Sequence, residues 1–179
     1  RRRTLGRWEV ATGSLKWRAT SLDSDFLDIS PDGNRIVHSG YDQVHRLIAR
    51  DVSTGNVVAS VRSPVRVFDL CFSPDGTQLA LIDYRSGEIR LADAESLNVS
   101  KPFPNSRVGE NVVRAIRWSP DGKNLLRSVG PSGIDVWDVE TQKVVKTLSY
   151  PEGQHLSLQS VCVSRDGQTV FAAGTSKLR

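Results

Sequence analysis

The stretch Ser30-Pro31-Asp32-Gly33 decides the fold, because it returns along the chain at nearly constant spacing. The later copies are Ser73-Pro74-Asp75-Gly76, Ser119-Pro120-Asp121-Gly122 and Ser164-Arg165-Asp166-Gly167. The steps between copies are 43, 46 and 45 residues. Proline sets φ to about −65° at the second position of a turn, and glycine accepts the left-handed conformation that follows. Each copy is therefore predicted to form a tight turn between two strands.

A second marker runs in phase with the first. Its copies are Trp8-Glu9-Val10-Ala11-Thr12-Gly13, Asp51-Val52-Ser53-Thr54-Gly55, Asp93-Ala94-Glu95-Ser96 and Trp137-Asp138-Val139-Glu140-Thr141. Counted from Glu9, the steps are 42, 42 and 45 residues. This marker predicts the next hairpin turn, in which Gly13 and Gly55 take positive φ. Two independent markers that hold one phase over four copies identify a repeat protein.

Short β-rich segments lie between the turns. In the second full repeat they are Val67–Phe72, Gln78–Ile82, Glu88–Leu91 and, less clearly, Leu97–Lys101. In the third they are Val112–Trp118, Asn124–Val129, Ile134–Trp137 and Val144–Leu148. Four strands in a period of about 45 residues are typical of a propeller blade.

Two of the predicted strands are apolar on both faces, namely Leu79-Ala80-Leu81-Ile82 and Val170-Phe171-Ala172-Ala173. A sheet with one wet face would alternate apolar and polar residues instead. We therefore expect both strands to be sandwiched between neighbouring sheets.

The Ser-Pro-Asp-Gly turns, the sequence Trp137-Asp138-Val139-Glu140-Thr141 and the period resemble the WD40-repeat family of β-propellers, from about Leu5 to Thr175. The resemblance implies an all-β fold of four-stranded antiparallel blades, with the first strand of each blade along a central channel and the fourth outermost. About four repeats are expected, as a partial propeller over residues 1–179. The expected parts are a partial blade over 1–22, blades over about 23–63, 64–102 and 103–149, and a partial blade over 150–179.

The sequence departs from the family pattern at the positions of a buried hydrogen-bond tetrad. The Gly-His pair that often precedes the first strand is absent, and the tryptophan position holds Arg50 and Ala92 in two repeats. Asp42 is the one plausible tetrad aspartate. The blades are therefore expected to be held by apolar packing and strand pairing. Related propellers without the tetrad, such as lactonase-like and quinoprotein-like ones, remain open.

The chain begins Arg1-Arg2-Arg3 without an initiator methionine, as expected of a piece of a longer protein. Family propellers usually close with more blades than this. We expect either a fragment or a chain that completes a ring with a second copy. Exposed blade faces predict self-association of the isolated piece.

Composition narrows the class of protein. Of 179 residues, 38% are hydrophobic and 25% charged, which is typical of a soluble core-forming chain, and no apolar run could cross a membrane. The 24 basic residues are interleaved with 20 acidic ones, so no nucleic-acid partner is predicted. Cys71 and Cys162 are expected to be free and buried, because they take one position in non-adjacent repeats. Free thiols favour a reducing, cytoplasmic location.

No set of residues predicts catalysis, a metal site or a cofactor. His38 and His45 bracket a hairpin turn and could face each other, but two imidazoles without a third ligand make a poor zinc site. They are expected to be surface residues, and His155 is the remaining histidine. Asp23, Asp25 and Asp28 are interpreted as a solvated strand end. No glycine-rich phosphate-binding motif occurs.

A candidate partner-binding surface lies on the face opposite the two turn markers. Six residues of types common at protein interfaces map to loops there: Tyr41, Tyr84, Tyr150, Arg66, Arg85 and Arg107. The function predicted by the family resemblance is a non-catalytic scaffold for protein–protein interaction, with protein partners.

Two alternatives remain open. One is a propeller enzyme such as a lactonase-like hydrolase, which would need carboxylates or histidines from several blades at the channel. The positions expected there are Asp28, Cys71, Arg117 and Cys162, which is not such a set. The other is a sensor domain fused to a kinase or protease.

Overall fold

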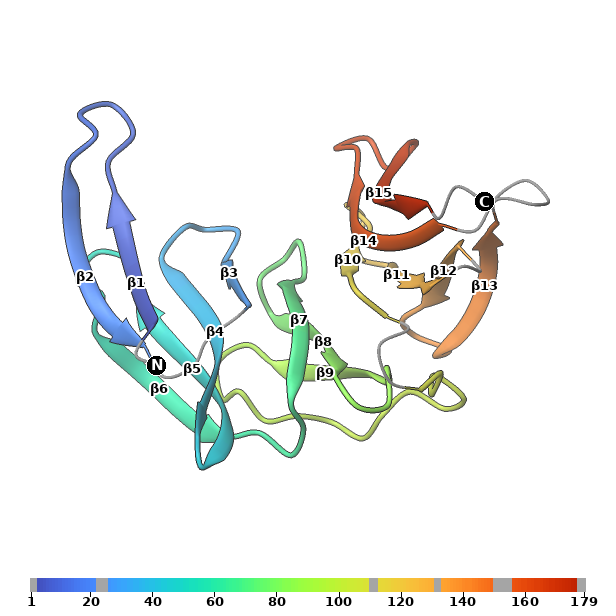
Figure 1. Cartoon of the computed structure of the whole chain (residues 1–179), viewed down its shortest axis with the longest axis horizontal. Coiled ribbons are helices and arrows are strands. Elements are labelled where there is room, and N and C mark those ends of the chain that lie inside the picture. The colour runs from blue at the N-terminus through green and yellow to red at the C-terminus, as the bar shows by residue number, and fades with distance from the viewer. Residues whose placement is uncertain (1–2, 22–25, 110–112, 131–132, 150–155, 177–179) are drawn as a thin grey trace.

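The computed structural model describes residues 3–21, 26–109, 113–130, 133–149 and 156–176, and all regular structure there is β. The strands form five small antiparallel sheets, and every paired strand follows its partner directly in sequence. The sheets follow one another along an open arc (Figure 1). The predicted all-β architecture of antiparallel blades is confirmed, whereas a closed ring is not formed by the described residues.

The first two sheets hold two and four strands. β1 (Arg3–Trp8) pairs with β2 (Leu15–Ser21). The second sheet consists of β3 (Leu27–Ile29), β4 (Arg35–Asp42), β5 (Val44–Asp51) and β6 (Val57–Arg62).

The third sheet holds three strands, which are β7 (Val67–Phe72), β8 (Gln78–Asp83) and β9 (Ile89–Asp93). The fourth holds β10 (Ile116–Trp118), β11 (Asn124–Val129), β12 (Gly133–Asp138) and β13 (Lys143–Leu148). The fifth pairs β14 (Leu156–Val163) with β15 (Val170–Ser176). β3, β7, β10 and β14 lie on the inner side of the arc (Figure 1).

Two predicted strands are shorter than expected. The segment Leu97–Lys101 contributes a single bridge between Ala92 and Val99, and therefore the third sheet lacks a full fourth strand. The strand expected from residue 112 begins at Ile116 among the described residues. The strands at Val67–Phe72 and Asn124–Val129 are confirmed to the residue.

The Ser-Pro-Asp-Gly turns are built by their own side chains. In the first, the Ser30 hydroxyl donates to Asp32 and accepts from the amide of Arg35 at 2.9 Å. The other three turns repeat both contacts, and the glycines have φ between 71° and 75°. The serine hydrogen bond is the main reason that the pKa of Asp32 is lowered. Sequence analysis assigned roles to the proline and glycine and missed the serine–aspartate pair.

These turns also pack against one another from blade to blade. A Cβ on Gly76 would lie 3.4 Å from the Pro31 ring, and one on Gly122 would lie 3.9 Å from the Pro74 ring. The same contact joins Gly167 to Pro120 at 3.7 Å. The motif therefore closes a hairpin and marks the spacing to the preceding sheet.

The core consists of three apolar layers between successive sheets. Leu79 and Leu81 of β8 pack with Val37 and Leu47 on the second sheet. On the opposite face of β8, Ala80 and Ile82 join residues of the fourth sheet. The strand at 79–82 is thus sandwiched as predicted, because all four side chains are buried. A third layer lies between the fourth and fifth sheets.

The prediction that the strand 170–173 is sandwiched between sheets was wrong: Phe171, Ala172 and Ala173 are exposed, and Val170 is partly buried. Phe171 is 62% exposed, and its cross-strand neighbour Cys162 is exposed rather than buried. The opposite face packs Leu158 and Val161 against the fourth sheet. No described sheet covers the Cys162 face, so its side chains meet solvent. Cys71, in the third sheet, is buried as predicted.

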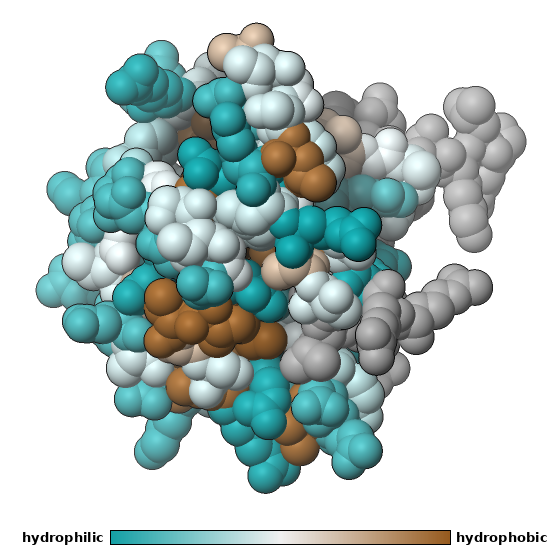
Figure 2. Space-filling model, turned by 90° about the vertical axis from the view of Figure 1, so that its left-hand side faces the viewer, coloured by the Kyte–Doolittle hydropathy of each residue, from teal (hydrophilic) through white to brown (hydrophobic). Residues whose placement is uncertain are grey.

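The end of the arc that holds β1 and β2 also exposes apolar side chains. Figure 2 looks from the side of β1 and β2 and shows brown apolar groups framed by teal polar ones. The exposed apolar residues of the first two sheets and the β1–β2 turn include Trp8, Val10, Leu15, Val57 and Val58. Among the described residues, no helix is long and apolar enough to cross a membrane.

Candidate functional site

A pocket of about 390 Å³ opens at the edge of the second and third sheets that carries the β4–β5, β6–β7 and β8–β9 connections. We call this edge the loop side, and the Ser-Pro-Asp-Gly turns lie at the other edge. Three of the predicted partner-binding residues line it: Tyr41 at the end of β4, Arg66 before β7, and Arg85 after β8. The remaining lining residues are Arg3, Ser39, Gly40, His45, Arg46 and Val67. We call these nine residues the arginine pocket. The structure thus places side chains from three sheets around one cavity.

Tyr84 does not line the pocket but contacts Arg66, which does. Its half-buried ring lies 4.1 Å from the Arg66 guanidinium carbon, and its amide donates to the Arg66 carbonyl at 2.8 Å. The ring stacks on Phe68 with centroids 5.6 Å apart, and Phe68 contacts Phe26 at 5.0 Å. A cation over an aromatic face is attracted by the ring quadrupole. Tyr84 therefore holds the Arg66 head group in place.

His45 is a pocket residue that the sequence analysis did not assign to the partner surface. It pairs with Tyr41 across the β4–β5 hairpin, and the two ring centroids are 5.0 Å apart. Burial lowers the pKa of His45, and the nearby Arg66 and Arg85 lower it further, while Asp83 opposes them. The imidazole is thus uncharged at neutral pH. The positive charge of the pocket comes from its guanidinium groups.

Arg107, another predicted partner-binding residue, is not among the residues that line this pocket. It is exposed, in the connection after the third sheet. The neighbouring amides of Val108 and Gly109 donate to the Ser86 carbonyl, which fixes that connection against the β8–β9 turn. Tyr150 lies outside the described residues.

The histidine prediction was wrong for His38. This residue is fully buried and pairs with Ile48, so it does not face His45 across the hairpin. Its Nε2 accepts a hydrogen bond from Arg50 Nε at 3.1 Å, and Nδ1 lies 2.9 Å from the Ser39 carbonyl. Because Arg50 can only donate, Nδ1 carries the proton and donates to that carbonyl. His155 lies outside the described residues.

Metal ligation has no support in the part of the chain that the structure describes. No group of three or more His, Cys, Asp or Glu side chains could hold an ion there. Of the aspartates considered for a cation site, Asp28 instead accepts from the Phe72 amide at 2.8 Å and so joins the second sheet to the third. Asp23 and Asp25 are outside the described residues.

The channel positions make contacts between sheets. Arg117 forms an ion pair with Asp69 of the third sheet at 2.7 Å. Burial raises the pKa of the Cys71 thiol, so this cysteine is protonated and a poor nucleophile. The Arg117–Asp69 ion pair and the hydrogen bond to Asp28 link successive inner strands. Cys162 is the exposed exception already described.

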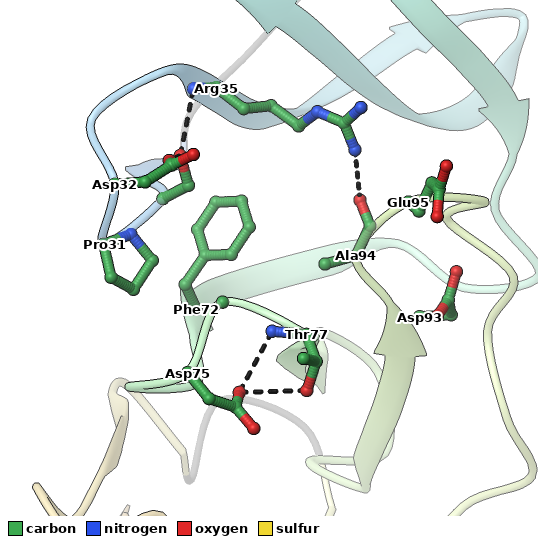
Figure 3. Close-up of a pocket in the computed structure, with 11 residues that line it drawn as sticks. Pro31, Asp32, Arg35, Phe72, Asp75, Thr77, Asp93, Ala94 and Glu95 are labelled. Carbon is green, nitrogen blue, oxygen red and sulfur yellow. Dashed lines mark hydrogen bonds between the residues drawn. The ribbon is translucent and has the colours of Figure 1, made fainter.

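A second pocket, of about 460 Å³, lies on the opposite side, among the turns (Figure 3). Arg35 spans it and donates to the Ala94 carbonyl at 2.8 Å, which joins the second sheet to the third. The Asp75 carboxylate beside it accepts from the amide and hydroxyl of Thr77 in its own turn. Arg35 and Asp75 of this pocket are thus engaged in holding sheets and turns together.

Known proteins that are similar in sequence to this chain are WD repeat-containing proteins. The chain is 28% identical over 165 residues to the WD repeat-containing protein VIP3 of Arabidopsis thaliana, covering 86% of this chain and 50% of that protein. It is 32% identical over 85 residues to WD repeat-containing protein 1 of Mus musculus, covering 48% and 14%. An uncharacterized WD repeat-containing protein of Synechocystis is 31% identical over 125 residues, covering 69% and 34%. No family model matches the chain.

The repeated turns and sandwiched sheets define a protein built from propeller blades. With these similarities, the chain belongs to the WD-repeat family. Such proteins are in general protein-interaction scaffolds and are typically non-catalytic. The chain spans half or less of the length of the relatives it matches.

Proposed function

We propose that this chain is a non-catalytic scaffold that binds a protein partner on its loop side, at the arginine pocket. The single observation that carries the proposal is the meeting of Tyr41, Arg66 and Arg85 around one cavity. Tyrosine and arginine are among the residues that contribute most to binding energy at protein interfaces. Tyr41 is 48% exposed and stands at the rim, where a partner can reach it.

The support beneath the pocket also favours binding. Tyr84 restrains Arg66, and the hairpin partner His45 lies against Tyr41. A side chain that is already restrained loses less conformational entropy when a partner binds. The site is therefore more ordered than scattered surface residues would be.

Capture of partners by immobilised protein tests the proposal. Wild-type chain and a Tyr41→Ala/Arg85→Ala variant are incubated with lysate from cells that carry the protein, and bound proteins are quantified by mass spectrometry. We expect the variant to lose most of the proteins that the wild type captures, because each truncated hot-spot side chain typically costs about 2 kcal/mol of binding.

An Arg165→Ala variant is the matched control. Arg165 is exposed in the turn between β14 and β15, on the side of the Ser-Pro-Asp-Gly motifs. Circular dichroism must show the same β spectrum for all three proteins. Equal capture by the wild type and the folded double variant would refute the loop-side site.

A further inference from the structure

We propose that the arginine pocket binds an acidic segment of a partner protein, through carboxylate side chains that pair with Arg46, Arg66 and Arg85. This inference rests on the proposed function and specifies the chemistry of the partner. It follows from the charges gathered at the pocket, from the absence of carboxylates that neutralise them, and from the shape of the charged surface.

The three guanidinium groups have no carboxylate partner in the described structure. The ion pairs found there join Lys16 to Glu9, Arg90 to Glu88, Arg117 to Asp69 and Arg127 to Asp135. No Asp or Glu is among the residues that line the pocket. The chain as a whole carries 20 acidic side chains, so the lack of carboxylates is a property of this cavity and not of the overall composition.

Arg46 shows the same imbalance within its sheet. It pairs directly with Arg62 across β5 and β6, so two like charges face each other on one surface. Like charges directly opposite in a sheet repel and destabilise the pair. An anion bound beside Arg46 would relieve this repulsion. Arg46 is also half-buried, which strengthens its interaction with any anion that reaches it.

Guanidinium groups are suited to carboxylates. Their planar donors match a carboxylate in a two-bond arrangement, and such charge-assisted bonds are about twice as strong as neutral ones. Arg85 and Arg66 are both exposed, and Arg66 is fixed over the Tyr84 ring. Two exposed arginines that line one pocket can take two carboxylates from one extended segment.

The arrangement of charged residues around the pocket favours a short peptide over nucleic acid. Asp42 and Asp83 lie beside the pocket, next to Tyr41 and Tyr84 in sequence, and Asp83 acts electrostatically on His45. Nucleic acid is bound along a basic stripe that follows its phosphates. Carboxylates at these positions would repel a continuous phosphate backbone laid across the pocket, whereas a peptide has to bring acidic residues only to the arginines.

The test is a fluorescence anisotropy titration with the whole chain. The probes are a fluorescein-labelled peptide of alternating Glu and Gly and a Gln–Gly peptide of the same length. We expect the Glu peptide to bind at least about tenfold more tightly at low salt, and the difference to shrink at high salt. Equal binding of the two peptides would overturn the inference.

Variants locate the binding. Arg85→Gln is expected to weaken Glu-peptide binding by about tenfold, whereas Arg85→Lys keeps part of it, because the charge remains without the two-bond geometry. Arg165→Gln removes one positive charge from the opposite side and is expected to leave binding unchanged. A loss in Arg165→Gln equal to that in Arg85→Gln would show general charge attraction and overturn the site.

Three further outcomes bear on this inference and on the proposed function. If a single-stranded oligonucleotide binds more tightly than the Glu peptide and loses affinity in Arg85→Gln, the pocket is a nucleic-acid site and the acidic-segment inference fails. If the Tyr41→Ala/Arg85→Ala variant loses captured proteins but the two peptides bind equally, the scaffold function holds and only the partner chemistry is wrong. If the Glu peptide elutes the captured proteins, both hold.

Discussion

At the scale of single residues, His38 makes the stability of the protein depend on pH. Its ring is fully buried beside Arg50, and burial lowers its pKa below the ordinary 6.5, with a further contribution from that arginine. The unfolded chain therefore binds a proton at His38 below pH 6.5 that the folded chain does not bind. The free energy of unfolding falls as the pH is lowered from 6.5 toward the folded-state pKa, by at most about 1.4 kcal/mol per pH unit.

Urea denaturation between pH 7 and pH 5 measures this effect. We expect the wild type to lose stability over the interval and a His38→Gln variant to lose less, although that variant starts from a lower value at pH 7. His45 is present in both proteins, so the difference between their slopes belongs to His38. Parallel slopes would contradict the assignment.

Buried charge was the feature of this chain hardest to predict from residues alone. Arg127 is 1% exposed and donates to the carbonyls of Gly87 and Ser106 and to Asp135 at 3.1 Å. In a strand that reads Asn124–Val129, nothing in the sequence shows that an arginine points inward. The two carbonyls lie 40 and 21 residues earlier in the chain and meet Arg127 only when the third and fourth sheets pack.

At the scale of elements, Gly55 shows how the first sheet docks on the second. Trp17 of β2 donates to the Val52 carbonyl at 2.8 Å, and a Cβ on Gly55 would lie 2.7 Å from its indole ring. Gly13 takes the same place in the preceding turn, with φ of 66° against 74°, but has nothing within 4 Å of its Cβ position. The two glycines differ in crowding and share their backbone conformation.

This pair yields a matched prediction. Gly13→Ala is expected to lower the free energy of unfolding by about 1 to 2 kcal/mol, because only the left-handed backbone is strained. Gly55→Ala is expected to cost about 1 to 3 kcal/mol more, since the indole must also move. Urea denaturation measures both, and the excess should vanish when Trp17→Leu is the background. Equal losses for the two alanine variants would show that Trp17 does not rest on Gly55.

Strands and turns were well predicted, because their signals are local. Proline, glycine and β-branched runs locate β7, β8 and β11 within a residue, and the glycine turns have the expected positive φ. Leu97 was not predictable in this way. It takes positive φ of 59° where Gly55 stands in the preceding repeat, and its side chain is fully buried between the second and third sheets. Burial of the leucine offsets the backbone strain.

At the scale of the whole molecule, uncovered apolar surface predicts association. Phe171 is 62% exposed on the last sheet, and Trp8 is 61% exposed on the first. We expect static light scattering at micromolar concentration to give a mass above that of one chain. Phe171→Glu should lower that mass and Phe171→Tyr should leave it nearly unchanged, because the tyrosine keeps the aromatic surface. A monomer mass for the wild type would refute this.

The candidate site was only partly predictable at this scale. The repeat placed Tyr41, Arg66 and Arg85 on one side, because loops of equivalent position share a face. Which of them meet depends on how the second and third sheets pack, and periodicity does not report that. In the structure, His45 and Arg46 also line the pocket. The register of the β4–β5 hairpin places His45 opposite Tyr41, and this register is the signal that could have identified His45 from the sequence.

Pairing of each strand only with its neighbours in sequence has a consequence for how the protein is made. The strands of each described sheet can pair as soon as their own stretch of chain has left the ribosome. The first finished sheets can then offer their apolar faces as templates for the next, in the order of synthesis. The arginine pocket, whose walls belong to the first three sheets, would come into existence as the third one docks, before translation reaches the last repeat.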